Sequence, residues 1–216
     1  MSKKNISQEK IIQAFLSSAF DKSAGATSLA DVADTLEIKK ASLYNHFESR
    51  DSMYEASIAY CAENIGQVEF VPAKLLESLN SGKTTVQAAM KKIISRYFSL
   101  FDSEPLFKMY VFVHSEQYFN VNALKIVQNQ NEKIAEDIKG LLASVIKNST
   151  DKDIKDIACA CTNLILAQLD AYIAVRKETI RQNPETGAGS LFELPSDNNI
   201  INRASKLVES LLAKLL

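Results

Sequence analysis

Apolar residues recur along most of this chain at intervals of three and four positions, the spacing that places them on one face of an α-helix. In the first third of the chain this pattern, with Ser7, Ser28 and Ser49 as capping residues, predicts four helices over about 8–22, 29–36, 40–46 and 50–65. The second and third are short, and helix nucleation is costly, so we expect the first and fourth to hold them in place. Two short helices joined by a tight turn and clamped between longer ones are typical of a helix-turn-helix unit.

Longer apolar stripes fill the remainder of the chain. The capping signals predict a helix that begins with Thr84 and Gln87 and ends near residue 101, a segment over about 103–147 with a break near Asn120, a helix over about 151–182 capped by Thr150, and a last helix capped by Ser196 or Asp197. No segment reads as a plausible strand. The sequence therefore predicts an all-α protein, with an N-terminal three-helix helix-turn-helix domain over residues 1–50 and a C-terminal helical bundle over residues 51–216.

The overall charge says little about a partner. The formal net charge is −1, and residues 1–50 carry seven Lys and Arg against six Asp and Glu. Bulk electrostatics therefore give no case for a polyanion, and an argument for nucleic acid has to rest on where individual charges are placed.

The cysteines and histidines argue against a metal, a cofactor or catalysis. Cys61, Cys159 and Cys161 have neither disulfide-like nor metal-like spacing, so we expect three small buried residues in a reducing cytoplasm. With two distant histidines and no Ser-His-Asp, metal or phosphate-loop motif, the sequence does not predict an enzyme. The most apolar stretch, 163–175, is short and interrupted by polar residues, so we expect no membrane partner.

Residues 39–47 alternate apolar anchors with basic and hydrogen-bonding side chains. Leu43 and Phe47 lie four positions apart, and we expect both to point into a small core with Leu36 and Ile38. The side chains left on the outer side are Lys39, Lys40, Ser42, Asn45 and His46, with Tyr44 at the edge. Lysine can reach guanine acceptors, asparagine can pair with adenine, and hydroxyl groups can bond phosphates, so such a helix suits the major groove. From spacing alone, the solvated face of an ordinary helical domain is an equally good interpretation.

These residues resemble the N-terminal domain of the tetracycline-repressor (TetR) family of regulators. Within TSLADVADTLEIKKASLYNHFESRDSMYEA, the marker elements are Val32-Ala33, Leu43-Tyr44-Asn45-His46-Phe47 and Ser49-Arg50-Asp51. The resemblance covers roughly a quarter of the chain. It departs at one position, because the family usually has glycine in the turn before the third helix and this chain has Glu37. A side chain in a left-handed turn costs on the order of 1 kcal/mol.

The resemblance implies a role for each matching residue. It implies phosphate contacts from Ser28, Tyr44, His46 and Arg50, and base or backbone contacts from Lys39, Lys40, Ser42 and Asn45. It also implies a ligand-responsive transcriptional regulator, in most cases a repressor, that binds double-stranded DNA. The alternative is a helical interaction module with a degenerate DNA-binding domain, which Glu37 and the weak net charge favour.

The resemblance further implies a homodimer formed through the last two helices. The apolar residues at 164–175 and 200–215 agree, because stripes this broad need covering on more than one side. Burial within one chain would also account for them. A two-fold dimer would set two recognition helices about 34–36 Å apart and so predicts a palindromic operator.

A concentration of aromatic residues suggests an effector site in the bundle. Residues 97–119 hold eight of the seventeen Phe and Tyr residues. Within them Tyr110, His114 and Tyr118 recur every four positions and would share one helical face. The candidate ligand-binding residues are Tyr97, Phe101, Tyr110, His114, Tyr118, Asn163 and Gln168. They would bind a hydrophobic or aromatic small molecule, although ordinary packing also explains most of these rings.

Overall fold

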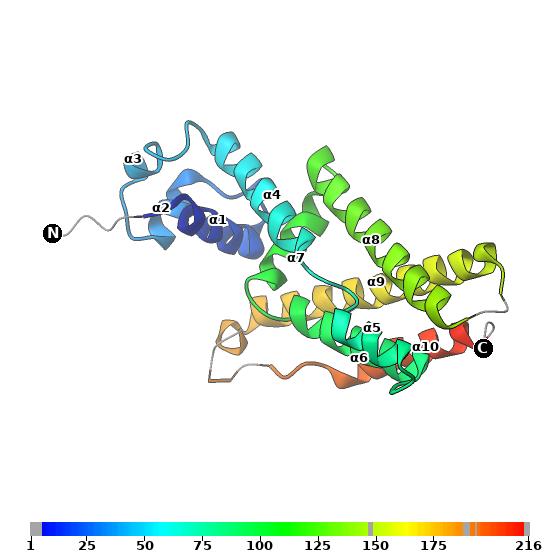
Figure 1. Cartoon of the computed structure of the whole chain (residues 1–216). Coiled ribbons are helices and arrows are strands. Elements are labelled where there is room, and N and C mark those ends of the chain that lie inside the picture. The colour runs from blue at the N-terminus through cyan, green and yellow to red at the C-terminus, as the bar shows by residue number, and fades with distance from the viewer. Residues whose placement is uncertain (1–5, 147–148, 188–190, 193, 214–216) are drawn as a thin grey trace. The chain divides into compact units, whose positions relative to one another are not determined.

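The structure is a computed structural model that describes residues 6–146, 149–187, 191–192 and 194–213. These residues form ten α-helices and one 3₁₀ turn, with no strand among them, and Figure 1 shows their order. The elements are α1 Gln8–Lys22, α2 Leu29–Thr35, α3 Lys40–Leu43, α4 Arg50–Gly66, α5 Ala73–Asn80, α6 Val86–Phe101, α7 Leu106–Glu116, α8 Val121–Val145, α9 Asp151–Gln182, η1 Pro184–Thr186 and α10 Asn198–Leu212. The predicted all-α fold is confirmed.

Most helix starts lie where the capping residues predict them. The hydroxyl oxygens of Ser7, Ser28, Ser49 and Thr150 each accept a hydrogen bond from a backbone N–H in the first turn of the helix that follows. Asn120 supplies the predicted break, since its Oδ1 accepts from the N–H groups of the first turn of α8 at 2.8 and 3.2 Å. Side-chain oxygens that satisfy otherwise unpaired N–H groups thus fix these boundaries.

The region before α6 differs from the prediction in two ways. The cap of α6 is Thr85, whose Oγ1 accepts from the N–H of Ala88, and Thr84 lies outside the helix. The sequence prediction also missed α5, an eight-residue helix. Its N-cap is Pro72, which provides no side-chain hydrogen bond, so the usual polar start signal is absent.

The contacts divide the chain into two compact units. The first consists of residues 1–67 and 108–127, and the second of residues 68–107 and 128–216. Residues 108–127, which hold most of α7 and the start of α8, therefore pack with the four N-terminal helices. These units are defined by contacts alone, and the functional division between residues 50 and 51 stays a prediction.

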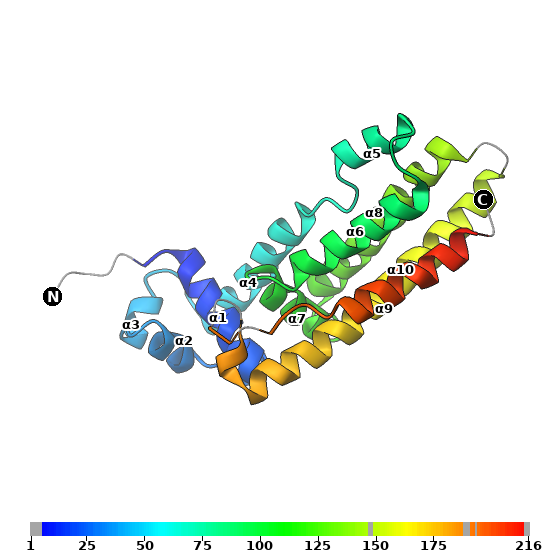
Figure 2. The same ribbon diagram turned by 90° about the horizontal axis from the view of Figure 1, so that it is seen from below.

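Within the second unit, α10 packs along both α6 and α9 (Figure 2). The buried side of α6 is the predicted stripe of Val86, Ala89, Met90, Ile93, Ile94, Tyr97, Phe98 and Phe101. α9 is long enough to span a membrane and contains one 18-residue window that is apolar enough to do so, and 44% of that window is buried inside the structure. Core helices of bundles meet the same criteria.

A buried ion pair ties three segments of the second unit together. Asp102, which ends α6, pairs with Arg176 of α9, and both side chains are at most 6% exposed. Arg176 also donates to the carbonyl oxygen of Leu194 at 2.9 Å, and the hydroxyl of Ser196 donates to Asp102 at 2.6 Å. The segment that leads into α10 is therefore held against α6 and α9 by charged groups that satisfy one another.

The cysteines differ in one respect from the prediction. Cys61 and Cys161 are buried, and burial raises the pKa of the Cys61 thiol to about 12 and that of Cys161 to about 11. Cys159 is exposed, which corrects the prediction for this residue. Because Cys159 and Cys161 lie two apart on a helix, their side chains point in different directions.

Candidate nucleic-acid interface and effector site

The turn between α2 and α3 is a left-handed helix end. Glu37 has φ 56°, its N–H donates to the carbonyl of Asp34, and the N–H of Ile38 donates to that of Ala33. These two hydrogen bonds are those of a Schellman motif, in which the residue after the cap is left-handed and is most often glycine. The predicted strain at Glu37 is therefore present in the structure.

Substitutions at Glu37 should follow its backbone conformation. We expect Glu37→Val to lower the free energy of unfolding by about 1–2 kcal/mol, because a β-branched side chain is strained at positive φ. Glu37→Gly relieves the strain but adds freedom to the unfolded chain, so its stability should stay within about 1 kcal/mol of the parent. Urea unfolding of both variants measures the difference, and a Val variant as stable as the Gly variant would contradict the left-handed turn.

The third helix is shorter than predicted. Only Lys40–Leu43 is α-helical, and the chain continues through a tighter turn in which His46 donates its N–H to the carbonyl of Leu43 at 2.9 Å. No side chain caps this helix at its start. Its position depends on packing instead, because Leu43 and Phe47 are buried as predicted and Gln8 of α1 donates to the carbonyl of His46 at 3.1 Å.

The outer face of this segment is polar and open. Lys39, Lys40 and Asn45 are exposed, and Tyr44 is 52% exposed despite its large ring. Ser42 and His46 are half-buried at its edge. The segment thus presents two cations, an amide and a phenol on one surface, which are groups that can bond base edges and phosphates.

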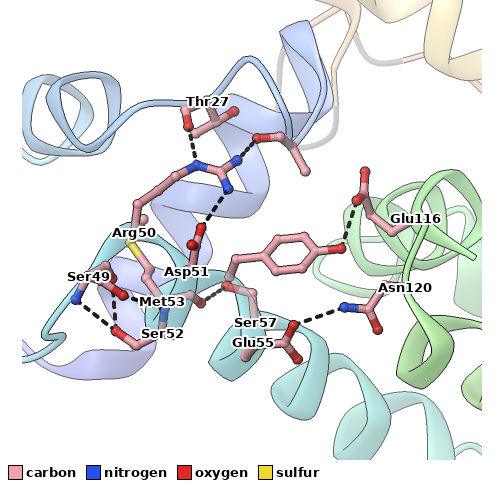
Figure 3. A network of polar contacts seen from close by, with 12 residues as sticks. Thr27, Ser49, Arg50, Asp51, Ser52, Met53, Glu55, Ser57, Glu116 and Asn120 are labelled. Atoms are coloured by element: carbon pink, nitrogen blue, oxygen red, sulfur yellow. Dashed lines mark hydrogen bonds and ion pairs between the residues drawn. The ribbon is translucent and has the colours of Figure 1, made fainter.

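Two of the predicted DNA contacts are engaged within the chain. Ser28 is exposed, but its hydroxyl donates to Asp31 and accepts from the N–H of the same residue as the cap of α2. Arg50, for which the resemblance implies a phosphate contact, bonds the loop between α1 and α2 in the structure (Figure 3). Its Nε donates to the carbonyl of Thr27 at 3.0 Å, and its guanidinium also bonds the carbonyl of Ala24. Arg50 bonds these carbonyl groups because the first turn of α4 begins beside the loop between α1 and α2.

The predicted effector residues fall into two separate groups. In the second unit Tyr97 and Phe101 are buried with ring centroids 4.9 Å apart, and Phe70 lies 5.0 Å from Tyr97. In the first unit Tyr110 is buried and stacks on His114 with ring centroids 3.8 Å apart.

The other three predicted effector residues are not gathered into these groups. Tyr118 is 81% exposed, so it does not share a buried face with Tyr110 and His114. That prediction failed because α7 ends at Glu116, beyond which helical spacing no longer applies. Asn163 is exposed on α9, and Gln168 is half-buried.

One buried polar residue near the aromatic rings was not predicted from the sequence. Gln130 of α8 donates its amide to the hydroxyl of Tyr97 at 2.6 Å, and its Oε1 has no partner among the described residues. Burial raises the pKa of Tyr97, so this phenol stays neutral. Gln130 was missed because it lies on a long polar helix pattern and only the structure places it beside Tyr97. No group of three or more His, Cys, Asp or Glu within the described part of the chain could hold a metal ion.

The sequence model described as "Bacterial regulatory proteins, tetR family" matches residues 11–57, which span most of α1, all of α2 and α3, and the first half of α4. Residues 11–57 therefore form a domain of the TetR family. It is also 25% identical over 166 residues to IcaR of Staphylococcus aureus, described as the HTH-type negative transcriptional regulator of the biofilm operon icaADBC. This alignment covers 76% of the chain and 81% of that relative.

Solved TetR-like structures share the fold over nearly the whole chain. A TetR-like regulator from Rhodococcus superposes with a TM-score of 0.60 at 18% identity, covering 99% of this chain and 97% of that one. A putative TetR-family regulator from Mesorhizobium loti gives a TM-score of 0.60 at 14% identity, with 96% and 95% covered. FadR from Bacillus subtilis, solved in complex with stearoyl-CoA, gives 0.55 at 14% identity, with 97% and 100% covered. The TetR family fold therefore extends beyond the matched N-terminal segment.

Proposed function

We propose that this protein is a ligand-responsive repressor that binds a palindromic DNA operator as a homodimer. The observation that carries the proposal is the open face of Lys39, Lys40, Tyr44 and Asn45 on a segment whose anchors are buried. Side chains that served only packing would not be turned outward together. We infer repression rather than activation because the relative IcaR is named a negative regulator. We place the protein in the cytoplasm, where its DNA would be.

The side chains of this face suit different chemical groups of DNA. Lys39 and Lys40 suit guanine acceptors or phosphates, Asn45 suits adenine, and the hydroxyls of Tyr44 and Ser42 suit phosphate oxygens. His46 would assist as a neutral hydrogen-bonding group or a phosphate contact at the edge. Residues 1–50 would provide this DNA-binding function, and residues 51–216 the effector-binding and dimerisation functions.

An incompletely covered face of α9 supports the dimer. Asn163, Ala167, Ala171 and Ala174 are exposed along α9, and Val175 is 67% exposed. Small side chains at a helix surface let a second helix approach closely, and an exposed valine beside them is stabilised when covered. On α10, Leu207 is also exposed. A second copy would cover these positions through two-fold symmetry.

The buried rings and Gln130 support an effector site in the second unit. An apolar surround with one polar group that lacks a partner favours a hydrophobic or aromatic molecule that carries a hydroxyl, amide or acid group. FadR, which shares the fold, is a protein solved with stearoyl-CoA, so the fold can accommodate a ligand with a long apolar chain. Regulation requires that the effector bind the DNA-free state more tightly than the DNA-bound state.

A DNA-binding measurement at several salt concentrations tests the proposal. Fluorescence anisotropy with the DNA upstream of the protein's own coding region should show specific binding. The logarithm of the association constant should fall linearly with the logarithm of the salt concentration. The slope should be about −0.9 for each neutralised phosphate. Salt-insensitive binding, or none at low salt, would favour the alternative of an interaction module with a degenerate DNA-binding domain.

A thermal-shift screen tests the effector site. An effector at about 100 times its Kd should stabilise the protein by about 2.7 kcal/mol, equivalent to a Tm increase of roughly 5–10 °C. The panel should contain aromatic, fatty-acyl and hydroxylated apolar compounds, and Gln130→Leu should reduce the shift for compounds with a polar group. A panel that shifts neither protein would remove the support for this site.

A further inference from the structure

The side chain of Arg50 occupies a position that a DNA contact alone does not explain. It extends from the first turn of α4 to the loop between α1 and α2, where it bonds the carbonyl oxygens of Ala24 and Thr27. Both of these loop residues are buried. Its third nitrogen lies 3.4 Å from Asp51, and 31% of the side chain remains exposed. A guanidinium carries five N–H donors in a rigid fork, which allows it to bridge two carbonyl groups at once.

The loop that Arg50 bonds sets the start of α2. The N–H of Thr27 donates to the carbonyl of Ala24, and the hydroxyl of Thr27 donates to the carbonyl of Ser23 at 2.8 Å. The next residue, Ser28, caps α2. A change in the position of Arg50 would therefore move the loop that ends at Ser28 and, with it, the first turn of α2.

The guanidinium of Arg50 also lies over two aromatic rings, and the Tyr54 ring packs against α7. Its central carbon lies 5.9 Å from the centroid of Phe15 and 5.8 Å from that of Tyr54, within the range of a cation–π contact. The Tyr54 ring lies 5.9 Å from the ring of Phe112 on α7 in an edge-to-face arrangement. Its hydroxyl donates to Glu116 at 2.8 Å, at the end of the same helix (Figure 3).

A second hydrogen bond fixes the same two segments. The amide of Asn120 donates to Glu55 at 3.0 Å, so neighbouring residues of α4 each bond the end of α7 or the turn after it. Burial and the Glu116 carboxylate raise the pKa of Tyr54, so its phenol remains a donor. Both aromatic and polar contacts therefore join α4 to α7 and the turn after it, and these contacts adjoin those of Arg50.

We propose that Arg50, Tyr54 and Glu116 form a positioning relay, through which the placement of α7 sets the start of α2 and hence the orientation of the recognition segment. In this relay Arg50 is a positioning residue for DNA binding, and its charge serves the loop carbonyls rather than a phosphate. The inference rests on the proposed DNA binding, and it adds a route by which a change in the placement of α7 reaches the DNA-binding face. That route runs beyond α4 to the loop before α2.

Two substitutions of Arg50 separate positioning from phosphate contact. Lysine keeps the charge but lacks the planar fork whose separate nitrogens bond the two carbonyl groups. Arg50→Lys should therefore weaken DNA binding about tenfold, as should Arg50→Gln, with an unchanged salt slope for the Lys variant. A phosphate contact would instead leave Arg50→Lys near the parent affinity. Arg96→Lys is the matched control, because Arg96 donates to the carbonyl of Glu69 in the other unit. Its DNA affinity should be unchanged.

Hydrogen exchange tests the relay without DNA. In Tyr54→Phe and in Glu116→Gln, the backbone amides of residues 24–29 should exchange several-fold faster, although neither substitution touches that loop. Tyr60→Phe is the control on the same helix, because it removes a 2.9 Å bond to Glu9 and leaves α7 untouched. The double variant Arg50→Lys with Tyr54→Phe should lose DNA affinity by a smaller factor than the product of the factors for the two single variants.

The outcomes distinguish the relay from the proposed function. A parent protein that binds no DNA would refute the proposed function, while the exchange measurement would still test the relay. Unchanged exchange at residues 24–29 in both Tyr54→Phe and Glu116→Gln, or parent-like DNA affinity of Arg50→Lys, would overturn it.

Discussion

The double variant Lys40→Ala with Tyr44→Ala should bind operator DNA about 100-fold more weakly than the parent, or not at all, and yet remain folded. Each lost contact to a base or phosphate is worth about 1–3 kcal/mol, and each 1.4 kcal/mol is a factor of ten in affinity. Lys40 is exposed and Tyr44 is 52% exposed, so their removal leaves the packing of Leu43 and Phe47 intact. A mobility-shift titration measures the affinity, and thermal unfolding shows that the fold persists.

A matched pair of surface residues controls for general effects. Phe119 and Lys125 are also exposed, and they lie on the α7–α8 segment rather than on the recognition segment. The variant Phe119→Ala with Lys125→Ala should bind DNA like the parent. Equal losses in the two double variants, or parent-like affinity of the Lys40 and Tyr44 variant, would show that the recognition segment does not carry the binding.

The second large effect concerns the buried pair of Asp102 and Arg176. Arg176→Met leaves the carboxylate of Asp102 buried without its charged partner, which should cost about 3–5 kcal/mol of unfolding free energy. For a chain of this length that corresponds to a Tm lower by roughly 6–20 °C. Urea unfolding and a thermal scan measure both quantities.

The matched double variant separates charge burial from lost packing. In Asp102→Leu with Arg176→Met both charges are removed, so much of the lost stability should return. The pair Arg181 and Glu178 on the surface of the same helix provides a control, because exposed pairs contribute only about 0–1 kcal/mol. A double variant as unstable as Arg176→Met alone would mean that shape rather than charge determines the cost.

Local signals predicted much of this structure. Ser7, Ser28, Ser49 and Thr150 cap helices because a short polar side chain before an apolar stripe can satisfy nearby N–H groups, which is a property of the sequence alone. The left-handed turn at Glu37 was predicted from the family resemblance. The outward face of Lys39, Lys40 and Asn45 followed from the spacing of their buried neighbours.

Contacts between distant segments could not be predicted in this way. Arg50 reaches Ala24 and Thr27, which lie 26 and 23 positions earlier in the chain. Gln130 and Tyr97 are 33 positions apart, and no periodicity within one helix reports on such a pair. Tyr118 was misplaced for the opposite reason, since a local spacing was extended past the end of its helix.

The most direct test of the central claim is the selection of bound fragments from a random pool of duplex DNA, with the stoichiometry of the selected complex measured by native mass spectrometry. A two-fold dimer with one recognition segment in each copy should enrich an inverted repeat whose half-sites lie about one helical turn apart, bound by an even number of chains. An asymmetric site bound by a single chain, or a pool without enrichment, would contradict it.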